Sequence, residues 1–188
     1  MKRPKLIALD MDGTMLDGES RLTERTKRAL RAAQDAGIRV VAATGRMYPS
    51  AMIHINDVGI KGACIFYNGA LIRDTATGET LYQRYLGREL AADILSFFHD
   101  RGWYVQMYCD DKLVVMDDAD ERCKFYENIC GQKAVALGER FWTCGCDSAK
   151  MLGVSFDKEL FAKMCDDVRR EFGSRIYQAT SWNAFIEM

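Results

Sequence analysis

The sequence lacks several features that would mark particular classes of protein. Among its 188 residues there are 2 prolines and 2 histidines, and no stretch rich in proline, glycine or serine indicates a flexible linker. No apolar run is long enough to cross a membrane, and the first residues, MKRPK, precede only a strand's length of apolar residues. We therefore expect neither a membrane span nor a signal peptide, and a cytoplasmic protein.

An excess of positive charge is also absent. The chain has 26 Lys and Arg residues against 27 Asp and Glu residues, which gives a formal net charge of -1. A protein that binds DNA or RNA needs basic side chains to neutralise the phosphate backbone. The composition therefore predicts no nucleic-acid partner, although it leaves a small phosphorylated ligand open.

Cysteine is present without the spacing of a metal site. The seven cysteines include no C-x-x-C pair. Cys144 and Cys146 form one C-x-C unit that could join Cys109 or His99 around zinc, but a single such unit is a weak signal. In a reducing compartment most cysteines are small buried apolar residues, so we expect them to be structural.

The most informative stretch is KLIALDMDGTMLDG, residues 5–18. An apolar run that resembles a buried strand ends on Asp10 and Asp12, and Gly13 and Thr14 follow at once. Buried charge is costly unless something compensates it, and where several oxygens converge the commonest compensation is a metal ion. The stretch therefore predicts a metal site.

The next segments alternate helices with strands. The pattern predicts a helix between Thr23 as N-cap and Gly37, a strand in IRVVAAT, a helix in YPSAMIHINDVG with Pro49 in its first turn, and a third buried strand in ACIFYN. This order is typical of a parallel α/β sheet with right-handed crossovers.

The pattern changes near residue 83. Two short strands precede this point around a Thr-Gly turn. After it the pattern predicts an amphipathic helix in RELAADILSFFHDRG, a hairpin of WYVQMYCD and KLVVMD, and further helices that alternate with strands. We therefore predict two domains, 1–82 with the parallel α/β pattern and 83–188 with an α+β pattern.

Polar motifs follow all three strands of the first part. They are Asp10 with Asp12, then Thr44, Gly45 and Arg46, and finally Asn68 with Gly69. Each motif alone is most simply a turn. Because ligands collect at the carboxyl edge of parallel strands, we expect the three to share one rim. Carboxylates, a hydroxyl, a guanidinium and an amide together suit a metal-assisted phosphate site.

The spacing of the two carboxylates suggests a mechanism. Residues two apart in an extended segment point the same way, and Gly13 lets the backbone tighten. Asp10 would be nucleophile and Mg²⁺ ligand, forming an aspartyl-phosphate, and Asp12 would be acid, base and second metal-binding residue. Thr44 and Arg46 would donate to phosphate oxygens, and the glycine between them would let the backbone approach.

These motifs resemble a known family. LDMDGT at 9–14, TGR at 44–46 and NGA at 68–70 are similar to motifs of the haloacid dehalogenase-like hydrolases, specifically the Cof-type sugar-phosphate phosphatases. The resemblance covers essentially the whole chain. It implies a Rossmann-like parallel sheet core with an inserted C2-type α+β cap at 83–188, Mg²⁺, an aspartyl-phosphate and a small phosphorylated metabolite as substrate.

The chain departs from the family in one respect. The family's phosphate-binding lysine and its acidic G-D-x-x-N-D motif are absent, and Lys150 lies in a predicted cap strand, so it does not correspond to that lysine. Two core strands are missing, so we expect the strand of Asp10 at a sheet edge. We expect the N-terminal portion of a longer phosphatase, with little activity alone.

Three other functions remain open. A phosphomutase of the same superfamily shares the aspartyl-phosphate. A phosphoacceptor signalling domain would need its acceptor Asp after the third strand, where this chain has Asn68. The third is a non-catalytic binding module on a degenerate phosphatase fold. We expect His54 and His99 to be surface or packing residues, and the sequence does not indicate an oligomeric state.

Overall fold

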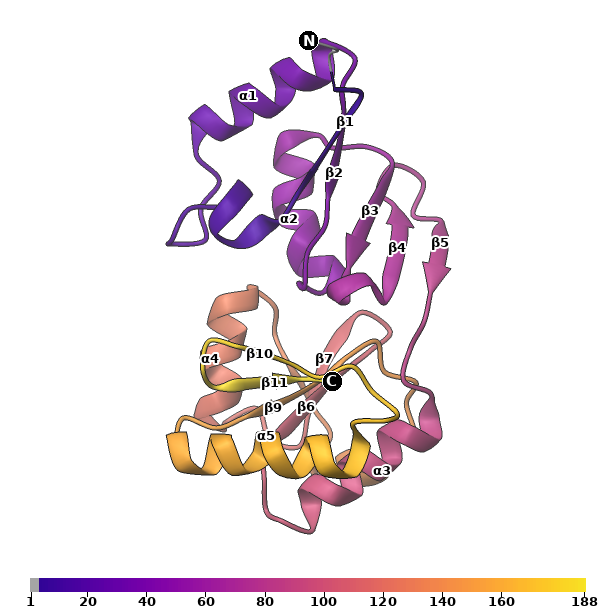
Figure 1. Cartoon of the computed structure of the whole chain (residues 1–188), viewed down its shortest axis with the longest axis vertical. Coiled ribbons are helices and arrows are strands. Elements are labelled where there is room, and N and C mark those ends of the chain that lie inside the picture. The colour runs from indigo at the N-terminus through magenta and orange to yellow at the C-terminus, as the bar shows by residue number, and fades with distance from the viewer. Residues whose placement is uncertain (1–3) are drawn as a thin grey trace. The chain divides into compact units, whose positions relative to one another are not determined.

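The computed structural model describes residues 4–188. The chain divides into two compact units, Met1–Arg84 and Tyr85–Met188, and both mix helices with strands (Figure 1). The predicted α/β fold class is therefore confirmed. None of the helices in the described part is both long enough and apolar enough to cross a membrane.

The first unit contains the predicted alternation of strands and helices. Its elements are β1 (Leu6–Leu9), a short helical turn (Met11–Met15), α1 (Glu24–Asp35), β2 (Arg39–Ala42), α2 (Tyr48–Val58), β3 (Ala63–Phe66), a single turn (Tyr67–Gly69), β4 (Leu71–Asp74) and β5 (Thr80–Gln83). Local signals set the helix ends. The Thr23 hydroxyl accepts the Thr26 N–H at 3.1 Å, and Pro49 lies in the first turn of α2.

The strands of this unit follow one another across the fold. β1 and β2 are parallel, from Leu6 opposite Arg39 to Leu9 opposite Ala42. A single parallel bridge between Ala43 and Ile65 joins β2 to β3. From β3 the chain continues through antiparallel β4 and β5 (Figure 1). The parallel part therefore consists of the three strands that precede the polar motifs.

The prediction that the first strand is buried is wrong. Leu6 is 50% exposed, and Asp10 and Asp12 are exposed as well. Within residues 4–188, β1 pairs with β2 alone, so it is an edge strand, as the missing core strands led us to expect. Exposed carboxylates stay hydrated, so Asp10 and Asp12 need no compensation for burial.

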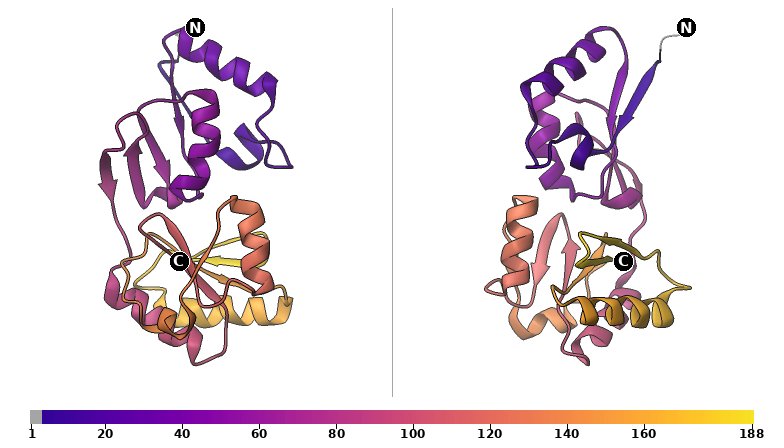
Figure 2. Two further views of the ribbon diagram at one scale, coloured as in Figure 1. Left: turned by 180° about the vertical axis from the view of Figure 1, so that it is seen from behind. Right: turned by 60° about the vertical axis from the view of Figure 1, so that its left-hand side comes forward.

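The second unit is one antiparallel-rich sheet with three helices. Its elements are α3 (Arg88–His99), β6 (Val105–Cys109), β7 (Lys112–Val115), α4 (Glu121–Cys130), β8 (Val135–Ala136), a short helical segment (Gly138–Thr143), β9 (Met151–Val154), α5 (Lys158–Phe172), β10 (Ala179–Ser181) and β11 (Phe185–Glu187). The strand order is β10-β11-β9-β6-β7-β8. Figures 1 and 2 show α3 and α5 on one face of this sheet and α4 on the other.

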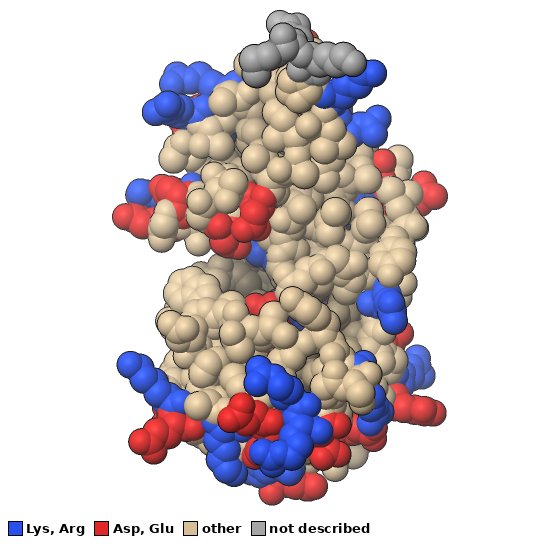
Figure 3. Space-filling view, viewed as in Figure 1, with Lys and Arg blue, Asp and Glu red and all other residues tan. Residues whose placement is uncertain are grey.

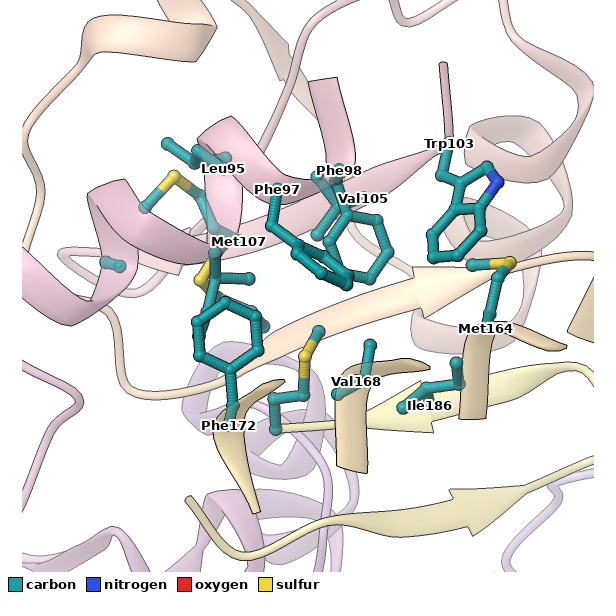
Figure 4. Packing of buried hydrophobic residues seen from close by; sticks show 14 of the residues in the cluster. Leu95, Phe97, Phe98, Trp103, Val105, Met107, Met164, Val168, Phe172 and Ile186 are labelled. Atoms are coloured by element: carbon teal, nitrogen blue, oxygen red, sulfur yellow. The ribbon is translucent and has the colours of Figure 1, made fainter. Parts of the chain in front are cut away.

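The core of this unit lies between the sheet and helices α3 and α5. Figure 4 shows Phe97 and Phe98 of α3 beside Phe172 of α5 and Val105 and Met107 of β6. The rings of Phe97 and Phe172 meet edge to face at 5.1 Å between centroids. Aromatic residues thus fill the space that the amphipathic pattern of α3 predicted to be buried.

Most predicted elements of the second unit are present. The hairpin between β6 and β7 turns at Asp110 and Asp111, whose φ angles are 48° and 59°. The two-residue strand β8 and the segment Gly138–Thr143 were not predicted, because they are too short to show a period.

Charges of both signs occur on each unit in the face that Figure 3 shows.

One pair of cysteines differs from the expectation that most of them are small buried apolar residues. Cys109 and Cys146 form a disulfide, with 6.1 Å between their Cα atoms. The end of β6 and the loop before β9 meet there, which sequence spacing could not reveal. Cys64, Cys123 and Cys130 are buried as expected. Across residues 4–188, no three or more His, Cys, Asp or Glu side chains are grouped to hold a metal, so the zinc alternative has no support.

Candidate active site

The three polar motifs meet at one edge of the first unit. The Ala43 N–H donates to the Leu9 carbonyl at 2.8 Å, which joins the chain after β2 to the end of β1. The Thr44 N–H donates to the Ile65 carbonyl at 3.0 Å, which joins the same segment to β3. The carboxyl ends of these strands therefore lie side by side, as the parallel arrangement predicted.

The second and third motifs are clamped together by their backbones. The Asn68 N–H donates to the Thr44 carbonyl at 3.2 Å, and the Tyr67 N–H donates to the Arg46 carbonyl at 3.1 Å. Gly45 lies between them and leaves room for the side-chain amide oxygen of Asn68, which a Cβ atom at this position would overlap. Asn68 itself has a φ of 55° and Gly69 a φ of 100°, so the turn uses residues that tolerate the left-handed region.

Asp10 and Asp12 lie on a turn with a buried anchor. Met11 and Met15 are buried beneath the turn, and Gly13 makes its bend with a φ of 71°. The Oδ1 atom of Asp10 accepts the Met11 N–H at 2.7 Å. The turn therefore presents both carboxylates at the surface while its apolar side chains hold it in place.

The carboxylate of Asp12 is paired with Arg46. Arg46 Nε donates to Asp12 Oδ2 at 2.9 Å, and Arg46 Nη2 donates to Asp12 Oδ1 at 2.6 Å. The Arg46 side chain is only 9% exposed, whereas that of Asp12 is 53% exposed. The donor fork that we expected to face a phosphate is therefore occupied by a carboxylate of the same site.

Thr44 is buried at the base of this rim. Its Oγ1 atom accepts the Arg46 N–H at 3.1 Å. Accepting this bond leaves the hydroxyl hydrogen available to donate. The structure thus places all seven predicted residues at one edge: Asp10, Asp12, Thr44, Gly45, Arg46, Asn68 and Gly69.

Sequence reasoning missed three side chains around Arg46. The Ser50 and Ser20 hydroxyls lie 3.4 and 3.3 Å from its guanidinium. His54 is close enough that the charge of Arg46 lowers its pKa, after burial, while Asp12 acts in the opposite direction. Ser50 and His54 follow Arg46 at intervals of four residues, a spacing that could have placed them on one side of α2. No sequence signal pointed to Ser20.

The exposed carboxylates have the chemistry of a magnesium site. Mg²⁺ prefers oxygen ligands and is commonly held by one or two carboxylates together with water and substrate phosphate. Asp10 and Asp12 supply two such carboxylates, which lie two residues apart on one anchored turn. The residues present therefore fit Mg²⁺, with Asp10 as the carboxylate that no guanidinium within residues 4–188 engages.

Known sequences that resemble this chain include several phosphatases. The sequence profile of the haloacid dehalogenase-like hydrolases matches residues 7–188. Phosphatase YwpJ of Bacillus subtilis is 36% identical over 104 residues, which are 55% of this chain and 36% of that protein. An HMP-PP phosphatase of Yersinia pestis is 32% identical in an alignment of 124 positions, which covers 58% of this chain and 44% of that protein. The chain spans less than half of the length of these relatives.

Solved structures show the same fold. A haloacid dehalogenase-like hydrolase from Bacteroides thetaiotaomicron matches with a TM-score of 0.89 at 21% identity, over 98% of this chain and 70% of that one. The sugar phosphatase BT4131 matches with a TM-score of 0.73 at 19% identity, over 97% of this chain and 68% of that one. At such identities the likeness concerns the fold alone.

Proposed function

The chain belongs to the haloacid dehalogenase-like hydrolase family, and on that premise we propose that it carries the reacting carboxylates of a Mg²⁺-dependent phosphatase. One observation carries the proposal. Asp10 and Asp12 stand exposed on an anchored turn at the edge where Thr44 and Asn68 also meet. Carboxylates beside hydroxyl, amide and guanidinium donors suit the attack on a phosphate ester and the binding of its oxygens.

The proposed substrate is a small phosphorylated metabolite. The names of the relatives support this class, because they include an HMP-PP phosphatase and a 5-amino-6-(5-phospho-D-ribitylamino)uracil phosphatase from Bacillus subtilis, which is 33% identical over 121 residues. We assign residues 1–82 to the N-terminal part of the catalytic core and residues 83–188 to a C2-type cap. The division of the chain after Arg84 supports this assignment.

The reaction would proceed in two displacements. An oxygen of Asp10 attacks phosphorus, a P–O bond to Asp10 forms, and the ester P–O bond breaks. Asp12 gives its proton to the departing alcohol and later takes one from the water that hydrolyses the aspartyl-phosphate. Bound Mg²⁺ would offset the repulsion between the Asp10 carboxylate and the phosphate.

The remaining residues of the rim would bind and orient. The Thr44 hydroxyl would donate to a phosphate oxygen, and Gly45 and Gly69 would let the backbone approach the ligand. Arg46 would hold the Asp12 carboxylate in place, because it already donates one hydrogen bond to each of the two carboxylate oxygens. We further propose a cytoplasmic protein in which residues 1–188 carry only part of the machinery, because the curated relatives are more than twice the length of the matched segments.

The test is Mg²⁺-dependent phosphate release from an aryl phosphate. We expect Asp10→Asn to abolish release, whereas Asp35→Asn, at the exposed end of α1, retains it. Intact mass spectrometry of the trapped intermediate should show one phosphoryl group on the wild type and none on Asp10→Asn. If the 188-residue chain releases no phosphate, the same two substitutions are tested in a longer chain that includes residues 1–188. Full release by Asp10→Asn in an active protein would overturn the proposal.

A further inference from the structure

The connection between the two units is anchored on both sides. On the first unit the Arg84 N–H donates to the Ala70 carbonyl at 2.8 Å. On the second unit the Leu86 N–H donates to the Ser148 carbonyl at 3.0 Å, and the Gly87 N–H donates to Asp147 Oδ1 at 2.8 Å. Residues 147–148 therefore fasten the chain at the point where it enters α3.

The loop that contains Asp147 is itself held at two points. On one side, Cys146 is bonded to Cys109 at the end of β6. On the other side, the Ser148 hydroxyl is 3.1 Å from the Tyr108 N and 2.6 Å from the Lys150 carbonyl. Asp147 lies between these two attachments. Its hydrogen bond with Gly87 is therefore restrained in part by the Cys109–Cys146 disulfide, which a two-electron reduction opens.

A third cysteine lies next to this disulfide. Cys144 precedes Cys146 by two residues, and Gly145 between them turns with a φ of 56°. The Sγ atom of Cys144 lies 3.4 Å from Met107 Sδ in the strand that ends at Cys109. Cys109, Cys144 and Cys146 are all partly exposed, whereas three of the other four cysteines are buried. Reagents in solution therefore have access to this group, which is a requirement for exchange.

We propose that Cys109, Cys144 and Cys146 form a thiol–disulfide exchange site, and that the oxidised Cys109–Cys146 pair fastens the connection between the units through Asp147. A small thiol attacks Cys146 Sγ, the S–S bond breaks, and its electron pair leaves on Cys109 Sγ, which takes a proton. A second thiol attacks the mixed disulfide and frees Cys146. The protein gains two electrons and two protons, and the two small thiols leave as their disulfide.

Cys144 gives the site a second route. Its thiolate can attack Cys146 Sγ and release Cys109 without any net change in oxidation. Either route opens the covalent link between Cys146 and β6, and the bond of Ser148 to Tyr108 is then the nearest attachment of Asp147 to that strand. The Asp147 bond to Gly87 should open more often, because one of its two flanking restraints is gone.

The first measurement counts thiols in the full chain. After denaturation without reductant, alkylation should modify five cysteines, and after reduction it should modify all seven. Peptide mapping should find Cys109 and Cys146 as the protected pair. Modification of both residues in a chain equilibrated with oxidised glutathione would overturn the proposal.

The second measurement follows the connection itself by hydrogen exchange. Amides of Leu86, Gly87 and the first turn of α3 should exchange about three- to tenfold faster in dithiothreitol than in oxidised glutathione. Cys109→Ser should exchange fast in both conditions, and Cys165→Ser, which alters a cysteine outside the disulfide, should behave like the wild type. If Cys109→Ser does not fold, the wild type in dithiothreitol still reports the exchange rates with the disulfide open. If these amides exchange equally in the two conditions while mapping confirms the disulfide, the proposal that the disulfide fastens the connection between the units is overturned.

Discussion

Arg46 and Asp12 form a side-on ion pair, with Nε to Oδ2 at 2.9 Å and Nη2 to Oδ1 at 2.6 Å, across 34 positions of sequence. The pair joins the turn after β1 to the loop after β2. It therefore sets the direction of a carboxylate that we propose to move protons. Both nitrogens come from one planar group, so neither contact can shift without the other.

The coupling between these two side chains is measurable without any turnover. In a double-mutant cycle of Asp12→Asn and Arg46→Gln, we expect an interaction energy of about 1 kcal/mol in the free energy of unfolding by urea. The exposure of Asp12 keeps this value below that of a fully buried pair. The same cycle with Asp35→Asn in place of Asp12→Asn should give additive effects, and additivity of the Asp12 and Arg46 changes would contradict the pairing.

Gly45→Ala should destabilise the edge of the first unit where the polar motifs meet. The added methyl group overlaps the side-chain amide oxygen of Asn68, and we expect a loss of about 1–3 kcal/mol in the free energy of unfolding. A second change, Asn68→Gly, should recover much of this loss because it removes the obstructing amide and suits the left-handed φ at that position.

Gly18→Ala is the matched control for that substitution, since a Cβ atom at Gly18 meets nothing within 4 Å. We expect it to change the free energy of unfolding by no more than about 0.5 kcal/mol. Equal losses for the two glycine substitutions would show that close packing against Asn68 is not the cause.

His54 should make the chain less stable in mild acid. Burial, and then the charge of Arg46, lower its pKa below the ordinary value of 6.5. The unfolded chain then binds more protons at this residue, so stability is fully present above pH 6.5 and falls as the pH drops through the lowered pKa. Urea unfolding at several pH values should show a smaller slope in this window for His54→Gln than for the wild type.

Two further substitutions separate the causes of this effect. Arg46→Gln should raise the pKa of His54 in an NMR titration, because it removes a positive charge nearby. Asp12→Asn should lower the pKa of His54 in the same titration, because it removes a negative charge nearby. A pKa of His54 that stays constant in Arg46→Gln would contradict the electrostatic part of the explanation.

Glu127 should stabilise the second unit through its charge. The side chain is 4% exposed, and it accepts Lys133 Nζ at 2.9 Å and the Ala134 N–H at 2.8 Å. We expect Glu127→Gln to lower the free energy of unfolding by about 1–2 kcal/mol, since bonds to a charged acceptor are stronger than neutral ones. Glu159→Gln, at an exposed position of α5, should have little effect.

The effect of Glu127 should depend on pH in a lower window than that of His54. The bond from Lys133, followed by the bond from Ala134, lowers the pKa of Glu127 below its ordinary value of 4.5. Its contribution is therefore present above pH 4.5 and is lost as the pH falls through the lowered pKa. Unfolding curves of wild type and Glu127→Gln should converge at low pH, and a constant difference between them would be inconsistent with this.

The elements that sequence alone predicted depend on neighbouring residues. Thr23 caps α1, Pro49 opens α2, and the hairpin turns at Asp110 and Asp111, because each signal acts within about one turn of chain. The order of strands and helices in the first unit likewise placed the polar motifs at one edge.

The sequence by itself determined which residue types arrive at that edge and the family to which the chain belongs. Only the tertiary structure decided that Arg46 pairs with Asp12, that Asp10 and Asp12 are exposed, and that Cys109 and Cys146 join. The physical reason is distance along the chain. Periodicity and capping report interactions over a few residues, whereas these contacts depend on how strands and loops far apart in sequence pack against one another.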